Sequence, residues 1–249
     1  MRHLPLTLET PAENLALDEA LLDAAEADEA AAGILRLWEP TDYFVVLGRS
    51  SSAQVEVNLA ACRRDRVPVL RRSSGGGTIL AGPGCLMYGV VVDFETYPQL
   101  QKIDVAHQFV LSQLASMLTV AGCEVLPSGT SDLAMRESAA APWRKFSGNA
   151  LRLKRRHLLY HGTLLYDFDL PRISRCLASP TRTPEYRQAR QHGEFVTNFP
   201  AERDALVKQL LTGWRADDTL SAWPQVRTAN LVLSKYTENP QWVIYHPAE

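Results

Sequence analysis

Apolar residues near the start of the chain recur first at the spacing of a strand and then at that of a helix. Leucines at positions 4, 6 and 8 alternate with other residues, which predicts a half-buried strand. Thr10 then opens the sequence T-P-A-E, in which threonine is an N-cap, proline takes the first helical position and glutamate completes a capping box. In the helix expected over residues 14–26, the apolar spacing turns Leu15, Leu22 and Ala25 toward the core.

The same reading of the remaining chain predicts strands that follow strands as often as they follow helices. Expected strands cover 34–40, 44–50, 67–72, 78–94 with an interruption at 82–84, 145–154 and 155–168. Expected helices cover 56–66, 104–122 from an Asp104 N-cap to a Gly122 C-cap, and 201–214. Residues 138–144 are expected to form a surface loop. The layout indicates an α+β fold rather than a βαβ repeat.

Length and composition narrow the class of protein. The 249 residues are 46% hydrophobic, enough for a real core, and no repeat or linker divides them, so one domain over 1–249 is expected. No 18-residue apolar run and no signal-peptide pattern occur. The net charge of −2 argues against a general nucleic-acid or membrane binder. The four cysteines are scattered, which argues against a disulfide scaffold and favours a reducing cytoplasm.

Three consecutive glycines, Gly75, Gly76 and Gly77, follow two arginines between expected strands. The simplest interpretation is a glycine hairpin loop. The alternative is a nest of backbone amides that holds an anion, with ligand lying directly on the backbone. Arg71 and Arg72 point in opposite directions along a strand end, so one of them should lie beside such a nest. The stretch is neither a Walker loop nor a dinucleotide fingerprint. The spacing leaves both interpretations open.

Lys145 stands out in the sequence "RKFSGNA" because lysine is rare in this chain. The 26 basic residues comprise five lysines and 21 arginines. A compact, movable point charge is therefore expected to be needed at Lys145, where it would neutralise a phosphate and a developing oxyanion. Ser147, Gly148 and Asn149 add hydroxyl, open backbone and amide groups. The alternative is an ordinary exposed lysine before a strand.

Two further candidates lie in strand-like segments. His157 and His161 share one side of an expected strand, but a third ligand is not evident, so a zinc site is not favoured. His161, beside Gly162, is instead a candidate hydrogen-bond donor to a ligand. Cys85 is either a buried small hydrophobe or an acyl-accepting nucleophile.

Taken together, these residues resemble the lipoate–protein ligase family of the biotin/lipoate ligase superfamily. The resemblance covers most of residues 11–200 and includes "NLALDEALL", "VPVLRRSSGGGTIL", "SDLA", "KFSGNA", "HGTLLYDFDL" and "FVTNF" in the family order. The joint occurrence of RR-x-SGGG, K-x-SGNA and HGTLL is highly specific. It implies a biotin/lipoate ligase-type catalytic domain with a mixed, largely antiparallel sheet flanked by helices.

The resemblance also implies roles for these residues. Lys145 would bridge the acyl carbonyl and the phosphate of an acyl-adenylate, and Asp132 would orient the acceptor lysine amine. Arg72 would contact the phosphate. An apolar tunnel involving Leu17, Leu21 and His161 would take the lipoyl chain. The remaining implied binding residues are Ser74, Gly75, Gly76, Gly77, Thr78, Ile79, Leu80, Ser147, Gly148, Asn149 and Gly162.

The implied activity is ATP-dependent formation or use of lipoyl-AMP, with Mg²⁺ brought by ATP, and transfer of the lipoyl group to a specific lysine. Implied acceptors are lipoyl domains of 2-oxoacid dehydrogenase complexes or the glycine cleavage H protein. The chain is too short for the C-terminal accessory domain of many family ligases, so a separate accessory subunit is a possible partner. Two alternatives remain: an octanoyl transferase that uses a cysteine thioester at Cys85, suggested by the "GPGC" segment, and a non-catalytic binder of lipoate or adenylate.

Overall fold

Two sheets of different size organise the chain in the computed structural model, which describes residues 1–249 except 31, 179–183, 238 and 248–249. The eight-stranded sheet has the order β11-β1-β2-β6-β10-β9-β8-β7 and the four-stranded sheet the order β12-β4-β3-β5. The large sheet contains β11 (Asp218–Thr219), β1 (Arg2–Leu4), β2 (Ile34–Trp38), β6 (Cys85–Asp93), β10 (His157–Leu165), β9 (Arg144–Leu153), β8 (Asp132–Arg136) and β7 (Glu124–Ser128). The small sheet contains β12 (Val243–Tyr245), β4 (Val69–Arg71), β3 (Phe44–Leu47) and β5 (Ile79–Ala81). Most neighbouring strands are antiparallel, and the α+β prediction is confirmed.

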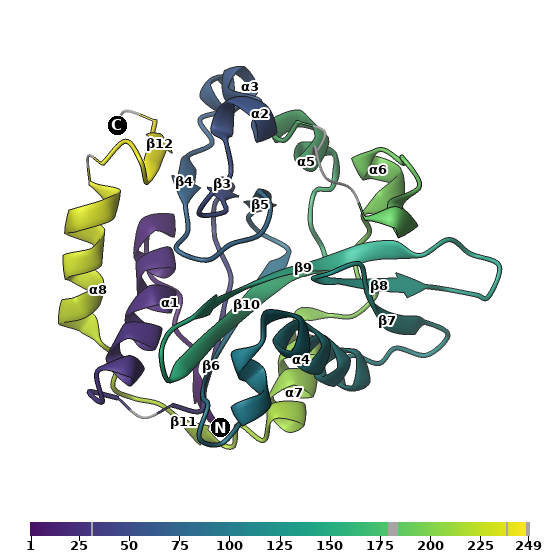
Figure 1. Cartoon of the computed structure of the whole chain (residues 1–249). Coiled ribbons are helices and arrows are strands. Elements are labelled where there is room, and N and C mark those ends of the chain that lie inside the picture. The colour runs from purple at the N-terminus through teal and green to yellow at the C-terminus, as the bar shows by residue number, and fades with distance from the viewer. Residues whose placement is uncertain (31, 179–183, 238, 248–249) are drawn as a thin grey trace.

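Helices cover both faces of the large sheet (Figure 1). The α-helices are α1 (Pro11–Glu26), α2 (Ala53–Glu56), α3 (Leu59–Arg64), α4 (Ile103–Met117), α5 (Pro171–Cys176), α6 (His192–Phe195), α7 (Arg203–Trp214) and α8 (Gln225–Leu231). Shorter 3-10 turns are η1 (Pro98–Gln101) and η2 (Glu185–Arg187), and a π-helical turn, η3 (Val232–Tyr236), follows α8. Helices α4 and α7 pack on one face and α1 on the other, with α8 beside α1 (Figure 1).

Strand β6 shows how the sequence divides the core in two. Leu86, Tyr88 and Val90 join the cluster under α4 and α7, whereas Met87 and Val91 face the opposite side. Successive side chains of a strand point to opposite faces, and here both faces are covered. This explains why β6 reads as a continuous apolar run rather than as an alternating one.

Two sequence predictions about element ends are corrected. The helix predicted over 104–122 begins at Ile103, with Lys102 as its N-cap, and ends at Met117. The side chain of Gln209 on α7 bonds both the backbone N–H and C=O of Thr119, which replaces helical bonds there. The predicted strand over residues 4–8 ends at Leu4, because the following backbone is bonded by the side chains of Asn14 and Arg36.

The capping box at Thr10 is confirmed: its hydroxyl accepts the N–H of Glu13, and the Glu13 carboxylate accepts the N–H of Thr10. Helix α1 is buried on nearly every side rather than on one stripe, since α8 covers its outer face. Asn14, Asp18 and Glu19 are therefore buried polar residues. Each of them has polar partners that link α1 to other elements.

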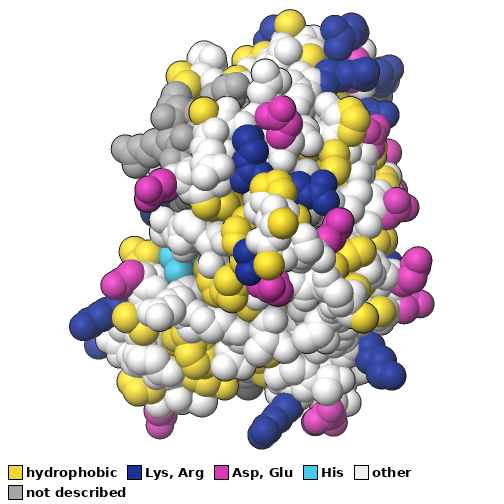
Figure 2. Space-filling view, turned by 90° about the vertical axis from the view of Figure 1, so that its right-hand side faces the viewer, with side chains coloured by type: hydrophobic (Ala, Val, Ile, Leu, Met, Phe, Trp, Pro, Cys, Tyr) yellow, Lys and Arg dark blue, Asp and Glu magenta, His cyan; other side chains and the backbone are white. Residues whose placement is uncertain are grey.

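Residues 137–143 form the loop between β8 and β9, which confirms the loop predicted over 138–144 except at Arg144, where β9 begins. Figure 2 looks onto the side of the molecule at the right of Figure 1, and there charges of both signs are mixed with small groups of hydrophobic side chains. Among the described helices, none combines the length and apolarity needed to cross a bilayer.

Candidate active site between the two sheets

The three glycines lie in a connection that passes over strand β3. Strands β4 and β5 are not neighbours, because β3 pairs with both of them. The hairpin interpretation of the glycine loop is therefore wrong. The connection passes so close to the end of β3 that a Cβ on Gly48 would lie 1.9 Å from the carbonyl oxygen of Gly76, which itself has φ +83°. Glycine is needed at both positions for this crossing.

Arg72 holds the loop from inside. It is 7% exposed, whereas Arg71 is half-buried and bonds carbonyls of the neighbouring segments. Arg72 Nη2 donates to the carbonyls of Gly75 (2.6 Å) and Gly77 (2.9 Å), and Nε donates to Ser74 Oγ (3.0 Å). Burial lowers the pKa of Arg72 to about 10, so the guanidinium stays charged at neutral pH. Its first structural role is to shape the loop.

A directed chain of hydrogen bonds continues from Ser74 to helix α1. Ser74 Oγ lies 2.6 Å from His161 Nε2, and His161 Nδ1 lies 3.2 Å from Asp18 Oδ2. Arg72 can only donate, so Ser74 Oγ accepts from it, and the Ser74 hydroxyl and His161 Nε2 share the second hydrogen bond. His161 Nδ1 donates to Asp18, whose other oxygen is 2.5 Å from Arg36 Nη1. His161 therefore locks the loop to α1 as an oriented ring.

Lys145 projects from β9 into the space between the sheets. Its Nζ lies 2.6 Å from Asp132 Oδ1 on the neighbouring strand β8, and the lysine side chain is 28% exposed. Tyr186 donates its hydroxyl hydrogen bond to Asp132 Oδ2 (2.9 Å). An added Cβ at Gly148 would lie 3.1 Å from Lys145 Nζ, so glycine leaves room for the ammonium there. The carboxylate thus orients the lysine without burying its charge.

The rest of the predicted "SGNA" and "HG" segments forms the wall behind Lys145. Asn149 Nδ2 donates to the Ser131 carbonyl (2.9 Å) and to Ser147 Oγ (3.1 Å), and Tyr88 donates to Asn149 Oδ1. A Cβ on Gly162 would lie 2.0 Å from Asn149 Oδ1. Gly162 is needed because the amide packs directly on the β10 backbone.

Two adjoining cavities meet at Lys145. The narrow cavity, about 90 Å³, is walled by Leu15, Asp18, Val46, Arg72, Met87, Asn149, Ala150, His161 and Gly162. The wide cavity, about 400 Å³, is walled by Glu56, Leu80, Thr130, Phe146, Ser147, Leu165, Ile173, Leu177, Ala178, Pro184, Arg187, His192, Phe195 and Val196. Both share Gly77, Thr78, Ile79, Ser131, Asp132, Lys145, Gly148 and Thr163. The predicted residues Ser74, Gly75 and Gly76 shape the loop without lining either described cavity.

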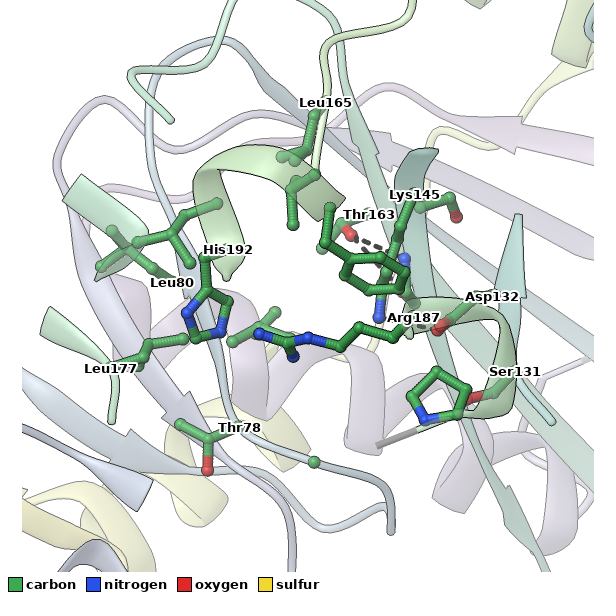
Figure 3. Close-up of a pocket in the computed structure, with 18 of the residues that line it drawn as sticks. Thr78, Leu80, Ser131, Asp132, Lys145, Thr163, Leu165, Leu177, Arg187 and His192 are labelled. Atoms are coloured by element: carbon green, nitrogen blue, oxygen red, sulfur yellow. Dashed lines mark hydrogen bonds and ion pairs between the residues drawn. The ribbon is translucent and has the colours of Figure 1, made fainter. Parts of the chain in front are cut away.

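The wide cavity also contains groups that sequence reasoning missed. Glu56 on α2 accepts the N–H (3.1 Å) and the hydroxyl (2.6 Å) of Thr78, which fixes the end of the glycine loop. Arg187 and His192 come from the segment after residue 183 and point into the cavity (Figure 3). Neither belongs to a motif, so their positions follow only from the fold. Asp18 had a detectable signal, since it shares a helix face with Leu15 and Leu22.

Cys85 does not have the surroundings of a nucleophile. It is fully buried, its Sγ contacts Met87 Sδ at 3.6 Å, and burial raises the pKa of its thiol. It lines neither described cavity. A thiol that ionises only at high pH and lies behind Met87, outside the lining of both described cavities, cannot readily accept an acyl group.

Two further predictions concern His157 and the acyl tunnel. His157 Nδ1 lies 2.9 Å from Glu26 and away from the site, and no group of three or more potential metal ligands occurs among the described residues. The predicted tunnel is corrected in part: His161 lines the narrow cavity, but Leu17 and Leu21 pack against Ile34, Val91 and Leu159 instead. Helix α1 presents Leu15 and Asp18 to the cavity.

The family comparison agrees with this geometry. The model of the "Lipoyl protein ligase A/B catalytic domain" matches residues 10–209, which include the glycine loop, Lys145 and His161. The chain belongs to this family. A provisionally named lipoate-protein ligase A from Aeropyrum pernix is 36% identical over 166 residues, 67% of this chain and 58% of that protein. The chain spans about half the length of the curated relatives it matches.

Solved structures share the fold of this family member. A provisionally named lipoate protein ligase from Thermoplasma acidophilum with bound lipoic acid superposes with a TM-score of 0.75 at 21% identity, covering 96% of this chain and 97% of that one. A bipartite ligase from the same organism, studied with its E2 lipoyl domain, gives 0.70 at 22% identity and covers 96% and 94%. A lipoate-protein ligase A bound with ATP gives 0.73 at 20% identity and covers 96% and 97%.

Proposed function

We propose that this chain is the catalytic part of a lipoate–protein ligase, which forms lipoyl-AMP from lipoate and ATP and transfers the lipoyl group to a lysine of an acceptor domain. The observation that carries the proposal is the position of Lys145, whose charged side chain lines both cavities where they meet. A ligase of this type joins an apolar acid to a nucleotide at one point. A cation at that point stabilises the negative charge that develops there.

The two cavities suit the two halves of lipoyl-AMP. The narrow cavity has apolar walls at Leu15, Val46 and Met87, which suit an acyl chain. The wide cavity combines apolar walls with the Thr78 end of the glycine loop and suits a nucleotide. The acyl carbonyl and the α-phosphate then meet beside Lys145. The relatives named above include one with bound lipoic acid and one with bound ATP, which supports this assignment.

Lys145 acts in both half-reactions in this proposal. In activation, a lipoate carboxylate oxygen attacks the α-phosphorus and pyrophosphate leaves. In transfer, the acceptor amine attacks the acyl carbonyl, AMP leaves and the amine loses a proton. Lys145 faces the reacting oxygens in both steps, and Asp132 keeps its ammonium in place. Asp132, which lines both cavities, is also the group proposed to orient the incoming amine.

Arg72 acts on the phosphate indirectly in this proposal. Its guanidinium is bonded to loop carbonyls and to Ser74, so it holds the glycine loop in the shape that binds the phosphate. Magnesium fits this site as the ion that accompanies ATP, held mostly by phosphate oxygens and water. Glu56 and Asp132 are the carboxylates that line the wide cavity, and Glu56 is the one that would contribute there, because both oxygens of Asp132 are engaged by Lys145 and Tyr186. The ion would reduce the charge repulsion between ATP and lipoate.

Implied acceptors are lipoyl domains of 2-oxoacid dehydrogenase complexes or the glycine cleavage H protein, consistent with the relative studied with an E2 lipoyl domain. All four cysteines are free, and a reducing cytoplasm is the proposed compartment.

The test incubates the pure chain with a lipoyl domain and measures the mass of that domain. One arm supplies ATP, Mg²⁺ and lipoate, and a second supplies synthetic lipoyl-AMP. A lipoyl adduct in both arms supports the full ligase. An adduct in the second arm alone assigns transfer to this chain and activation to an accessory partner. No adduct in either arm, with lipoyl-AMP bound in calorimetry, would replace the proposal with a non-catalytic binder.

A further inference from the structure

A buried arginine crosses the wide cavity, and its two Nη nitrogens have no partner among the described residues. Arg187 is 5% exposed and lies at the end of η2. Its Nε donates to the Arg190 carbonyl (2.8 Å), and its guanidinium lies 5.0 Å from the Phe195 ring centroid. Within the described part of the chain, its two Nη nitrogens have no hydrogen bond or ion pair. Figure 3 shows the side chain reaching across the cavity toward His192. A buried guanidinium left in this state favours an anionic ligand.

The other charged groups of the cavity do not satisfy Arg187. The charge of Asp132 acts on Arg187 and opposes the effect of burial on its pKa. Both Asp132 oxygens, however, are engaged by Lys145 and Tyr186, and Glu56 is engaged by Thr78. His192 cannot pair with Arg187 as an anion. Burial, followed by the charges of Arg187 and Lys145, lowers the pKa of its imidazole, so the ring stays neutral and can donate a hydrogen bond. Among the described residues, this end of the cavity therefore has a cation without an ion-pair partner and a neutral ring beside it.

The direction in which the leaving group departs during activation identifies the anion that Arg187 would bind. Activation is an in-line displacement, in which the attacking and leaving oxygens lie on opposite sides of the phosphorus. With lipoate in the narrow cavity, the leaving group departs from Lys145 into the wide cavity. Arg187 and His192 line the wide cavity and not the narrow one.

We propose that Arg187, assisted by His192, binds the pyrophosphate end of ATP and stabilises pyrophosphate as it leaves the α-phosphorus. This inference rests on the proposed ligase function. A carboxylate oxygen of lipoate forms the new bond to the α-phosphorus, and the bond from that phosphorus to the α,β-bridging oxygen of ATP breaks, with its electron pair leaving on pyrophosphate. No proton moves in this step. The charge that builds on the leaving group falls beside Arg187, and transfer of the lipoyl group to the acceptor lysine needs no such cation.

The inference predicts that Arg187 affects one half-reaction only. Arg187→Gln should slow lipoyl-AMP formation at least 100-fold, while transfer from synthetic lipoyl-AMP stays within about threefold of the unmodified protein. Arg187→Lys should restore part of the activation rate because it returns the charge without the bidentate geometry. The matched control is Arg144→Gln. It removes an arginine from an exposed ion pair with Glu137 at the start of β9. It should change neither half-reaction.

A binding measurement keeps this inference separate from the proposed function. Calorimetry with inorganic pyrophosphate and Mg²⁺ should show binding to the unmodified protein and at least tenfold weaker binding to Arg187→Gln. Lipoate affinity should be equal in both proteins, which also reports that the variant is folded. Equal pyrophosphate affinity in the two proteins, or equal loss of activation and transfer in a folded variant, would overturn the role of Arg187. Absence of lipoyl transfer by the unmodified protein from either donor would instead count against the ligase proposal.

Discussion

At the scale of single residues, Lys145 has a near match in the same strand region. Lys154, just beyond the end of β9, also pairs with a carboxylate at 2.6 Å and is 26% exposed, against 28% for Lys145. Lys145→Ala should reduce both activation and transfer by at least 100-fold, since in the proposed mechanism the cation faces the reacting oxygens in each step. Lys154→Ala should leave both rates near normal. Single-turnover rates of both proteins test this, and a Lys145→Ala protein with near-normal rates would refute the assignment.

Cys85, in contrast to Lys145, is expected to be dispensable for transfer. Cys85→Ala removes a buried sulfur that packs on Met87, so it should lower the free energy of unfolding by about 1 kcal/mol. Transfer from synthetic lipoyl-AMP should remain within about twofold. Intact-mass measurement after incubation with octanoyl carrier protein should detect no acyl-enzyme. An acyl adduct mapped to Cys85 would restore the octanoyl transferase alternative.

At the scale of elements, the glycine loop allows strain to be separated from binding. Gly76 and Gly33 both have positive φ, at +83° and +81°. A side chain at either should cost about 1–2 kcal/mol in strain, but only at Gly76 would it meet a neighbour, Arg72 Nη2 at 2.9 Å. Gly76→Val should therefore abolish binding of a non-hydrolysable lipoyl-adenylate in calorimetry. Gly33→Val should lower the unfolding temperature yet bind normally, and equal binding by both variants would contradict the role of the loop.

The helices and strands also show which parts of the fold and of the candidate site could be predicted from the sequence and which could not. Periodicity and capping located the start of α1 and most strands, because these depend on neighbouring residues. The end of α4 was misplaced because Gln209, distant in sequence, bonds the backbone of Thr119. The sequence left the hairpin interpretation of the glycine loop open for the same reason, since only the fold places β3 between β4 and β5. The motifs identified Lys145 and the loop, whereas Arg187 entered the site through a segment without any motif.

At the scale of the whole molecule, the Asp18–Arg36 pair connects the core to the site. It joins α1 to β2 and, through His161 and Ser74, joins α1 to β10 and the glycine loop. Arg36 is fully buried and its other acceptors are neutral, namely two backbone carbonyls and the Asn14 side chain. Asp18 is therefore the charge that compensates it. Loss of this carboxylate should affect both the stability of the fold and the order of the loop.

Asp18→Asn should lower the free energy of unfolding by about 3 kcal/mol, because it leaves a buried guanidinium without its counter-charge. Glu29→Gln is the control, because it breaks the ion pair between Glu29 and Arg227. The side chain of Arg227 is 33% exposed and that of Glu29 is 57% exposed, so the loss of this pair should cost less than about 1 kcal/mol. Urea unfolding of both variants makes the comparison. A cost for Asp18→Asn no larger than that of the control would show that the neutral acceptors alone satisfy Arg36.

The pH dependence gives an independent check on the same pair. Burial alone would raise the pKa of Asp18, but the charge of Arg36 and the bond to His161 hold that pKa below its ordinary value. A carboxyl whose folded pKa is depressed stabilises the protein above its unfolded pKa of about 3.9 and loses that contribution as the pH falls through the folded value. The unmodified protein should therefore lose stability below about pH 4, and Asp18→Asn should lose less over the same range. Parallel acid-unfolding curves for the two proteins would mean that Asp18 does not titrate as the partner of Arg36.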